Sequence, residues 1–169
     1  MSRISVFILS AFATLWLVLA KLNGAEIGWI IPVIGAVISA LLVWHSTRVL
    51  PEHSSHTPSE QRRQNRIFTW ASVGEGVGIF LVINILANIG MADRFMAGIA
   101  LVVGLHFIPI AKGLPLPAYF AIAAALIILS IAGFVLPSAQ TAALVLGYGG
   151  ALTMWLGALW GMWGKEGES

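Results

Sequence analysis

The chain has 169 residues, of which 59% are hydrophobic and only 9% are charged, and its formal net charge at pH 7 is +2. Soluble domains carry about 25% charged residues, so a core of this size could not bury so much apolar surface away from water. The composition therefore excludes a soluble enzyme, a nucleic-acid-binding protein and a disordered chain. It predicts a membrane protein whose main partner is the lipid bilayer.

Charged residues fall almost entirely between long apolar runs, which marks the ends of the candidate membrane spans. A helix needs about 20 apolar residues to cross the hydrocarbon core. The charge-free stretch after Gly113 is too long for one span, and Pro137 divides it because proline resists continuation of a helix. The sequence thus predicts an all-α bundle of six transmembrane helices in a single domain, 1–169. The helices are expected at about 4–21, 27–46, 67–91, 94–112, 116–136 and 139–162, with a polar loop at 47–66.

Basic residues are distributed unevenly between the two sides that this helix order defines. The side of both termini carries Arg3, Arg48, Arg62, Arg63, Arg66, Lys112 and Lys165, and the other side carries only Lys21 and Arg94. The positive-inside rule then predicts that both termini and the polar loop are cytoplasmic. The first apolar run, Ile4 to Ala20, is longer than the roughly 7–15 residues of a signal-peptide core, so we expect a retained helix.

The polar loop at 47–66 contains a helix start. Thr57, Pro58 and Glu60 match a threonine N-cap, a proline at the first helical position and a glutamate that completes a capping box. The third helix should therefore begin before the membrane and carry three arginines at headgroup depth, where they would attract anionic lipid. These arginines are Arg62, Arg63 and Arg66.

The sequence predicts no metal site and no cofactor. Glu52, His53 and His56 could in principle bind a metal ion, but they lie in a Ser/Pro-rich loop without a fourth ligand, so we expect a solvated loop. The chain has no cysteine and therefore no disulfide, thiolate nucleophile or cysteine metal site.

One charged side chain, Glu75, lies inside a predicted span. If the third helix enters the bilayer near Ile67, Glu75 lies about 12 Å inside. A carboxylate at that depth costs about 2.5–3.5 kcal/mol unless it is protonated or paired, so such a residue usually marks a functional site. The alternative is a protonated glutamate that hydrogen-bonds the backbone of a neighbouring helix. Ser72 lies on the same helix face as Glu75 and is a further candidate for the site.

His106 matches Glu75 in depth. It lies about 9 Å from the end of the fourth helix near Lys112, and consecutive helices usually pack together. Pro109 removes the hydrogen bond to the Leu105 carbonyl, which should break the helix and leave an acceptor free beside the histidine. The sequence thus predicts a proton-sensitive Glu75–His106 site. A neutral histidine bonded within the bundle, beside an ordinary proline kink, is the alternative.

Other polar residues in the spans are candidates for supporting roles. Asn84 and Asn88 lie on the opposite face of the third helix from Glu75, which predicts a central helix with protein or water on both sides. With Asp93 they could line an outer vestibule, but hydrogen bonds between helices are the favoured interpretation. His45, at the inner end of the second helix, could be a third polar residue at the depth of Glu75 and His106, but only if the second helix lay close to the third and fourth.

Glycines spaced four residues apart predict close contacts between helices. Gly74 and Gly78 form such a pair in the third helix, and Gly157 and Gly161 form one in the sixth. Pairs of this kind admit a neighbouring backbone in membrane proteins. We expect packing, rather than a ligand surface, at both pairs.

Two segments resemble a family of small uncharacterised bacterial multi-pass membrane proteins. They are 74–78, Gly-Glu-Gly-Val-Gly, and 104–111, Gly-Leu-His-Phe-Ile-Pro-Ile-Ala. The resemblance covers the third to fifth helices and its motifs are moderately specific. It implies a bacterial cytoplasmic membrane and the same glutamate and histidine in a glycine-rich helix and a proline-broken helix, but no activity.

The leading hypothesis is a small inner-membrane protein that transports or binds a small solute at a proton-sensitive Glu75–His106 site. An intramembrane enzyme with Glu75 as general base, or a metal-binding protein, is the second class, but the sequence shows no evident nucleophile, cofactor motif or third metal ligand. An accessory or structural membrane subunit is the third. The sequence leaves the solute, the direction of transport and the oligomeric state open, a homo-oligomer included.

Overall fold

The computed structural model describes residues 2–50, 57–114 and 117–163, and within these ranges the chain forms six α-helices, one short 3-10 turn and no strand. The elements are α1 (Arg3–Leu22), α2 (Ile30–Val49), α3 (Pro58–Asn88), η1 (Ala92–Arg94), α4 (Phe95–Gly113), α5 (Pro117–Val135) and α6 (Ala139–Trp163). All six helices are long and apolar enough to cross a membrane. The predicted all-α bundle is confirmed, and the helices indicate a multi-pass membrane protein.

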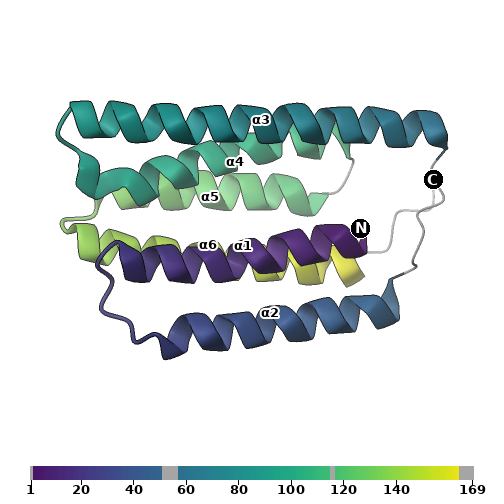
Figure 1. Cartoon of the computed structure of the whole chain (residues 1–169), viewed down its shortest axis with the longest axis horizontal. Helices are drawn as coiled ribbons and strands as arrows, with labels where there is room; N and C mark the ends of the chain where they lie inside the picture. Colours follow the sequence, from purple (N-terminus) through teal and green to yellow (C-terminus); the bar gives the residue numbers. More distant parts are fainter. Residues whose placement is uncertain (1, 51–56, 115–116, 164–169) are drawn as a thin grey trace.

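The helices pack in the spatial order α3, α4, α5, α6, α1, α2. α3 and α2 therefore lie at opposite edges of the bundle, and α1 begins at the same end as α6 finishes (Figure 1). We call this end, where Arg3, Arg66 and Lys112 lie, the arginine end, and the opposite end, which carries η1, the η1 end. Which of the two ends faces the cytoplasm stays a prediction.

α3 is an edge helix, so the prediction of a central third helix was wrong. Only 6% of its apolar span is buried, against 50% of the α4 span, and it packs mainly on α4. Asn84 and Asn88 are exposed, and their side-chain amides donate to the carbonyl oxygens of Phe80 and Asn84 in the same helix. The favoured hydrogen bonds between helices are therefore absent at these two side chains. Asparagine can satisfy its amide on its own helix, so its presence on a face does not require a neighbour there.

α3 begins well before the expected span of 67–91. The Glu60 N–H donates to Thr57 Oγ1, and the Thr57 N–H donates to Glu60 Oε2 at 2.9 Å, which confirms the predicted capping box. The helix has 31 residues and is about 46 Å long, more than the hydrocarbon thickness of about 30 Å. Gly113 at the end of α4 lies against Ile67, so the part of α3 before Ile67 extends past the bundle (Figure 1). The polar loop is correspondingly shorter than 47–66.

α2 is shifted along the chain by three residues, to Ile30–Val49 instead of 27–46. The chain turns at Gly24, whose φ of 89° favours glycine, and the Ile27 N–H bonds the Ala25 carbonyl instead of starting a helix. Apolar character continues through this turn because Ile27 is buried against the bundle. Hydropathy therefore placed the span correctly but not its first helical residue.

Two arginines satisfy the carbonyl groups that helix ends leave free. At the arginine end, Arg3 donates to the carbonyls of Thr47 and Leu50 at the end of α2, each at 2.9 Å. At the η1 end, Arg94 Nη1 donates to Gly133 O at 3.0 Å and Leu136 O at 2.8 Å at the end of α5. Both arginines thus act as C-caps.

Glycine contacts join α1 to α6. A Cβ at Gly147 would collide with Ala20, and one at Gly150 would lie 2.7 Å from the Trp16 ring. Of the predicted glycine pairs, Gly157 contacts Ile122 and Gly78 contacts Val102, as expected. Gly74 faces open space, so its expected packing role was wrong.

Candidate functional site

Glu75 of α3 and His106 of α4 meet at the contact between their helices. His106 Nδ1 lies 3.6 Å from Glu75 Oε2 and 3.0 Å from the Ala71 carbonyl oxygen. The side chains are only 14% exposed for Glu75 and 7% exposed for His106. The structure therefore brings together the two residues that the sequence placed at one depth, while their functional role stays a prediction.

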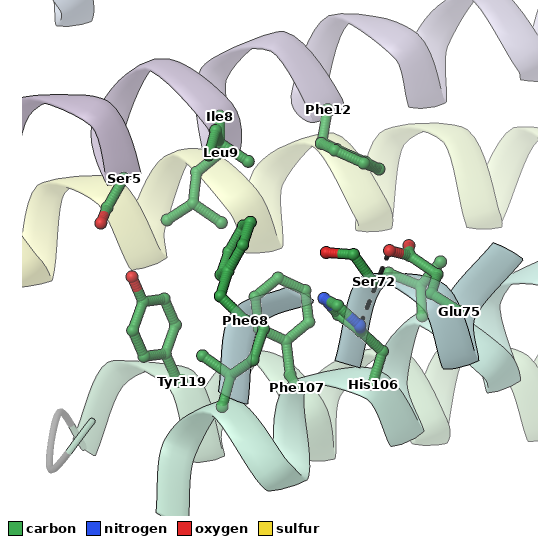
Figure 2. Close-up of a pocket in the computed structure, with 12 residues that line it drawn as sticks. Ser5, Ile8, Leu9, Phe12, Phe68, Ser72, Glu75, His106, Phe107 and Tyr119 are labelled. Atoms are coloured by element: carbon green, nitrogen blue, oxygen red, sulfur yellow. Dashed lines mark ion pairs between the residues drawn. The ribbon is translucent and has the colours of Figure 1, made fainter. Parts of the chain in front are cut away.

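The Ala71 carbonyl fixes the orientation of the histidine. A carbonyl can only accept a hydrogen bond, so His106 Nδ1 carries the proton that this bond uses. Figure 2 shows the other ring nitrogen, Nε2, pointing away from Glu75 and into a cavity. In the neutral ring Nε2 is an acceptor, and in the doubly protonated ring it becomes a donor. The hydrogen-bonding character of the cavity therefore depends on the protonation of this ring.

Pro109 does not break α4, contrary to the prediction from the sequence. α4 continues through Pro109 to Gly113, so the helix is not broken there. Pro109 and Leu105 are both exposed on the surface of the bundle. The acceptor that His106 uses belongs to Ala71 of α3 and not to Leu105 of its own helix. The histidine is positioned by packing between helices, which the sequence of α4 alone does not encode.

A cavity of about 260 Å³ lies beside the pair, between α1, α3, α4 and the start of α5 (Figure 2). Its polar groups are found at two places. Ser72, Glu75 and His106 lie toward the middle of the bundle, and Ser5 and Tyr119 lie toward the arginine end. Aliphatic and aromatic side chains separate the two groups, so the cavity is apolar with polar patches at its two ends.

Tyr119 and Ser5 are members of the cavity wall that the sequence analysis missed. Tyr119 is only 5% exposed, and its ring stacks on Phe107. Its hydroxyl faces the side chain of Ser5 on α1 (Figure 2). No local pattern could have paired two residues from the first and fifth helices.

Several predicted contributors lie elsewhere. His45 is on α2, which packs on α1 and α6 at the far edge of the bundle from α3 (Figure 1). Asp93 is in η1, where it is 52% exposed and pairs with Arg94 Nε at 3.2 Å. Asn84 and Asn88 bond their own helix and are exposed. Of the seven side chains proposed besides the helix-breaking proline, only Glu75, His106 and Ser72 line the cavity.

No three acidic or histidine side chains in 2–50, 57–114 or 117–163 gather closely enough to hold a metal ion. The loop candidates, Glu52, His53 and His56, lie outside the described residues.

A second buried polar cluster joins α1, α2 and α6. Ser39 Oγ donates to the Ser10 carbonyl at 2.7 Å, lies 2.9 Å from Thr14 Oγ1 and accepts a bond from Trp155 Nε1 at 3.0 Å. This cluster could not be recognised from the sequence, because serine, threonine and tryptophan are common in apolar helices. None of its side chains changes charge near neutral pH, and neither described cavity includes Ser39 or Thr14.

Comparison of the chain with protein-family models, curated proteins and solved structures finds no match. The function is therefore inferred from the chemistry of the Glu75–His106 site itself.

Proposed function

We propose that the protein binds or transports a small solute in the membrane, with Glu75 and His106 as its proton-sensitive site. The observation that carries this proposal is an acid–histidine pair, largely buried within apolar helices, whose free ring nitrogen faces a cavity. Ionisable side chains at membrane depth are expensive and usually belong to substrate or proton pathways. Ser72 is the third member of the site because its hydroxyl lines the same cavity.

The pair can hold one proton in two ways, as a carboxylate beside an imidazolium or as a carboxylic acid beside a neutral ring. Each arrangement presents a different set of donors and acceptors to the solute. The other polar groups that line the cavity are Ser5, Ser72 and Tyr119, and none of them is charged at neutral pH. A change in the protonation of the pair therefore dominates any change in the affinity of the site.

Proton flux in liposomes tests this function. Purified wild-type protein should dissipate an imposed pH gradient in a way that depends on Glu75, so Glu75→Gln should lower the rate to that of protein-free liposomes. Glu26→Gln removes an exposed carboxyl in the loop before α2 and is the matched control, with the wild-type rate expected. Equal flux through the wild type and Glu75→Gln would exclude the pair from the mechanism.

An intramembrane hydrolase is the second candidate, because a serine, a histidine and a glutamate line one cavity. No hydrogen bond joins Ser72 to His106 within the part of the chain that the structure describes. The surrounding N–H groups lie within helices, where they bond carbonyls and leave no evident donor for an oxyanion. A fluorophosphonate that labels wild type and Ser5→Ala but not Ser72→Ala would establish the hydrolase and overturn the solute-binding proposal.

We also propose a bacterial inner-membrane location with both termini in the cytoplasm and with Arg62, Arg63 and Arg66 near anionic headgroups. The three arginines are exposed on the part of α3 that extends past the bundle. Because the chain has no cysteine, single cysteines report the topology directly. In intact cells an impermeant maleimide should label Asn23→Cys and not Gln61→Cys, and the reverse pattern would contradict the orientation.

A further inference from the structure

The cavity beside Glu75 continues along the groove between α1 and α3. A second cavity, of about 190 Å³, adjoins the first because Phe12 and Val103 line both. α1 forms one wall from Ser5 to Leu19, a length of about 21 Å at the rise of an α-helix. α1 packs on α2 and α6 while α3 packs on α4, so the two helices border the groove without closing it.

The groove opens sideways toward lipid. Leu15, in the wall of the second cavity, is 44% exposed, and Phe68, in the wall of the first, is 40% exposed. Both residues lie in helices that are apolar enough to cross a membrane. Phe68 lies close to Arg66 and the headgroups, whereas Leu15 lies well inside the α1 span, where hydrocarbon chains rather than water are expected around it. A ligand can therefore reach the groove directly from the bilayer.

The second cavity suits an apolar chain and not a polar solute. Its walls are aliphatic and aromatic side chains of α1, α3 and α4, among them Leu15, Leu19, Ile79 and Ile99. Cavities with such walls stay dry and bind apolar molecules. The second cavity is therefore suited to the hydrocarbon chain of a ligand.

The polar end of the groove favours a hydroxyl group. His106 Nδ1 is engaged by the Ala71 carbonyl, so Nε2 is free to accept a hydrogen bond from a ligand in the cavity. The Ser72 hydroxyl can donate one in return, and the Glu75 carboxyl lies beside them. A hydroxyl both donates and accepts, whereas an anionic head would face the carboxyl of Glu75 without a fixed cation in the cavity wall.

The geometry points to a long-chain alcohol as the solute, with its hydroxyl at His106 and Glu75 and its chain in the second cavity. This inference rests on the proposed function, because it names the class of solute that the Glu75–His106 site takes. The hydroxyl can donate to Nε2 of the neutral ring, and its oxygen can accept from Nε2 of the doubly protonated ring. The Glu75 carboxyl, Ser72, Ser5 and Tyr119 are the other polar groups that line the cavity.

Photo-crosslinking tests the position of the chain. A long-chain alcohol carrying a diazirine in its chain would be added to the full-length protein in lipid nanodiscs, and labelled peptides mapped by mass spectrometry. Label is expected on α1 near Leu15 and on α3 near Ile79. Leu15→Trp fills the second cavity and should lower labelling about tenfold or more, the scale of steric discrimination in an apolar pocket.

Leu41→Trp is the matched control, because Leu41 is 58% exposed on α2 and borders neither cavity. Labelling of this variant should equal that of the wild type. Leu15 is half-exposed, so Leu15→Trp is expected to fold, and Ile79→Trp fills the same cavity from α3 as a second variant.

Competition tests the hydroxyl. The unlabelled alcohol should compete about tenfold better than the alkane of equal length, the effect of one hydrogen bond of about 1.4 kcal/mol. The carboxylic acid of equal length should compete no better than the alkane. In His106→Phe, which keeps a ring but has no nitrogen, alcohol and alkane should compete equally.

Two results would overturn the inference: labelling that Leu15→Trp and Ile79→Trp leave unchanged, and equal competition by alcohol and alkane in the wild type. If either result is found while proton flux still depends on Glu75, the long-chain alcohol is excluded as the solute and the proposed Glu75–His106 site is retained. Groove-specific labelling together with equal flux in wild type and Glu75→Gln removes the proposed function instead, and leaves a lipid-binding groove.

Discussion

Two polar regions between the apolar helices, the Ser39 cluster and the Glu75–His106 site, differ in how their hydrogen bonds are used. In the Ser39 cluster the polar groups of three helices bond one another, with Ser39 Oγ at 2.7 Å from Ser10 O and 3.0 Å from Trp155 Nε1. At the Glu75–His106 site one ring nitrogen bonds Ala71, and the other faces an open cavity. In the first region the side chains of Ser39, Thr14 and Trp155 find partners within the protein, although Ser10 Oγ is buried without one, while in the second region one ring nitrogen faces the cavity.

The packing around the two regions differs in the same sense. α1 and α6 are held together by glycine contacts at Gly147 and Gly150, and Gly35 of α2 lies close to Leu17. On the other side only 6% of the α3 span is buried, and a Cβ at Gly74 or Gly76 would meet no atom of a neighbouring helix within 4 Å. The contact between α1 and α6 is thus tight, while α3 and α1 leave space at the two cavities. A buried polar side chain in a membrane protein is therefore best assigned to stability or to a binding site by asking whether other groups of the protein satisfy its hydrogen bonds.

The largest expected effect is on the chemical modification of the Glu75 carboxyl. A hydrophobic carbodiimide modifies a carboxylic acid that lies in an apolar surrounding, so it should modify Glu75 and leave the exposed Glu26 and Asp93 unmodified. Glu75→Gln should abolish the modification, whereas Ser39→Ala should leave it unchanged, because Ser39 lies outside the cavity. Mass spectrometry of the labelled protein measures both, and a loss of labelling in Ser39→Ala would show that the two regions are not independent.

The next effect concerns the glycine contacts. Gly147→Val should lower the free energy of unfolding by about 3 kcal/mol, because its side chain collides with Ala20 and must separate α1 from α6. Gly74→Val, the same exchange at an open position, should change it little. Unfolding in sodium dodecyl sulfate, followed by tryptophan fluorescence, compares the two. Similar losses for both variants would contradict the difference in packing.

A smaller loss is expected when Ser39 is removed. Ser39→Ala leaves Trp155 Nε1 and Thr14 Oγ1 without their shared partner and should cost about 1–2 kcal/mol of unfolding free energy. Ser72→Ala is the matched control, because no hydrogen bond to Ser72 is present in the described part of the chain, and it should be close to neutral. The same unfolding assay measures both, and a larger loss for Ser72→Ala would refute the assignment of the Ser39 cluster to stability.

The smallest effect is on the stability of the site itself. Glu75→Gln should leave the unfolding free energy unchanged or raise it by up to about 1 kcal/mol, because an ionisable group at membrane depth is costly and the amide has almost the same shape. Ser39→Ala serves as the reference for a residue that stabilises the fold. A loss in Glu75→Gln as large as that in Ser39→Ala would mean that the carboxyl is structural, whatever its effect on flux.

The site could be predicted only in part. Glu75 and His106 were recognisable because each is unusual in an apolar helix, and helix geometry placed them at one depth. The roles of Pro109, His45 and Asn84 were not recognisable, because each depends on which helix faces which. The same is true of Tyr119, whose sequence position near the start of α5 is equally suited to a membrane surface and to a cavity wall.

The sequence by itself determined that the chain forms apolar helices and where these helices are interrupted. It also determined that α3 is capped by Thr57 and that Glu75 lies inside an apolar helix. These features follow from hydropathy, proline and capping chemistry, which act over a few neighbouring residues. Only the tertiary structure decided that α3 lies at the edge, that His106 bonds Ala71 and that α1 leaves a groove beside Glu75. Lipid can solvate every face of an apolar helix, so hydropathy does not determine which helices are neighbours. The order of the helices is set by how their side chains fit together, and this fit cannot be read from the sequence of one helix alone.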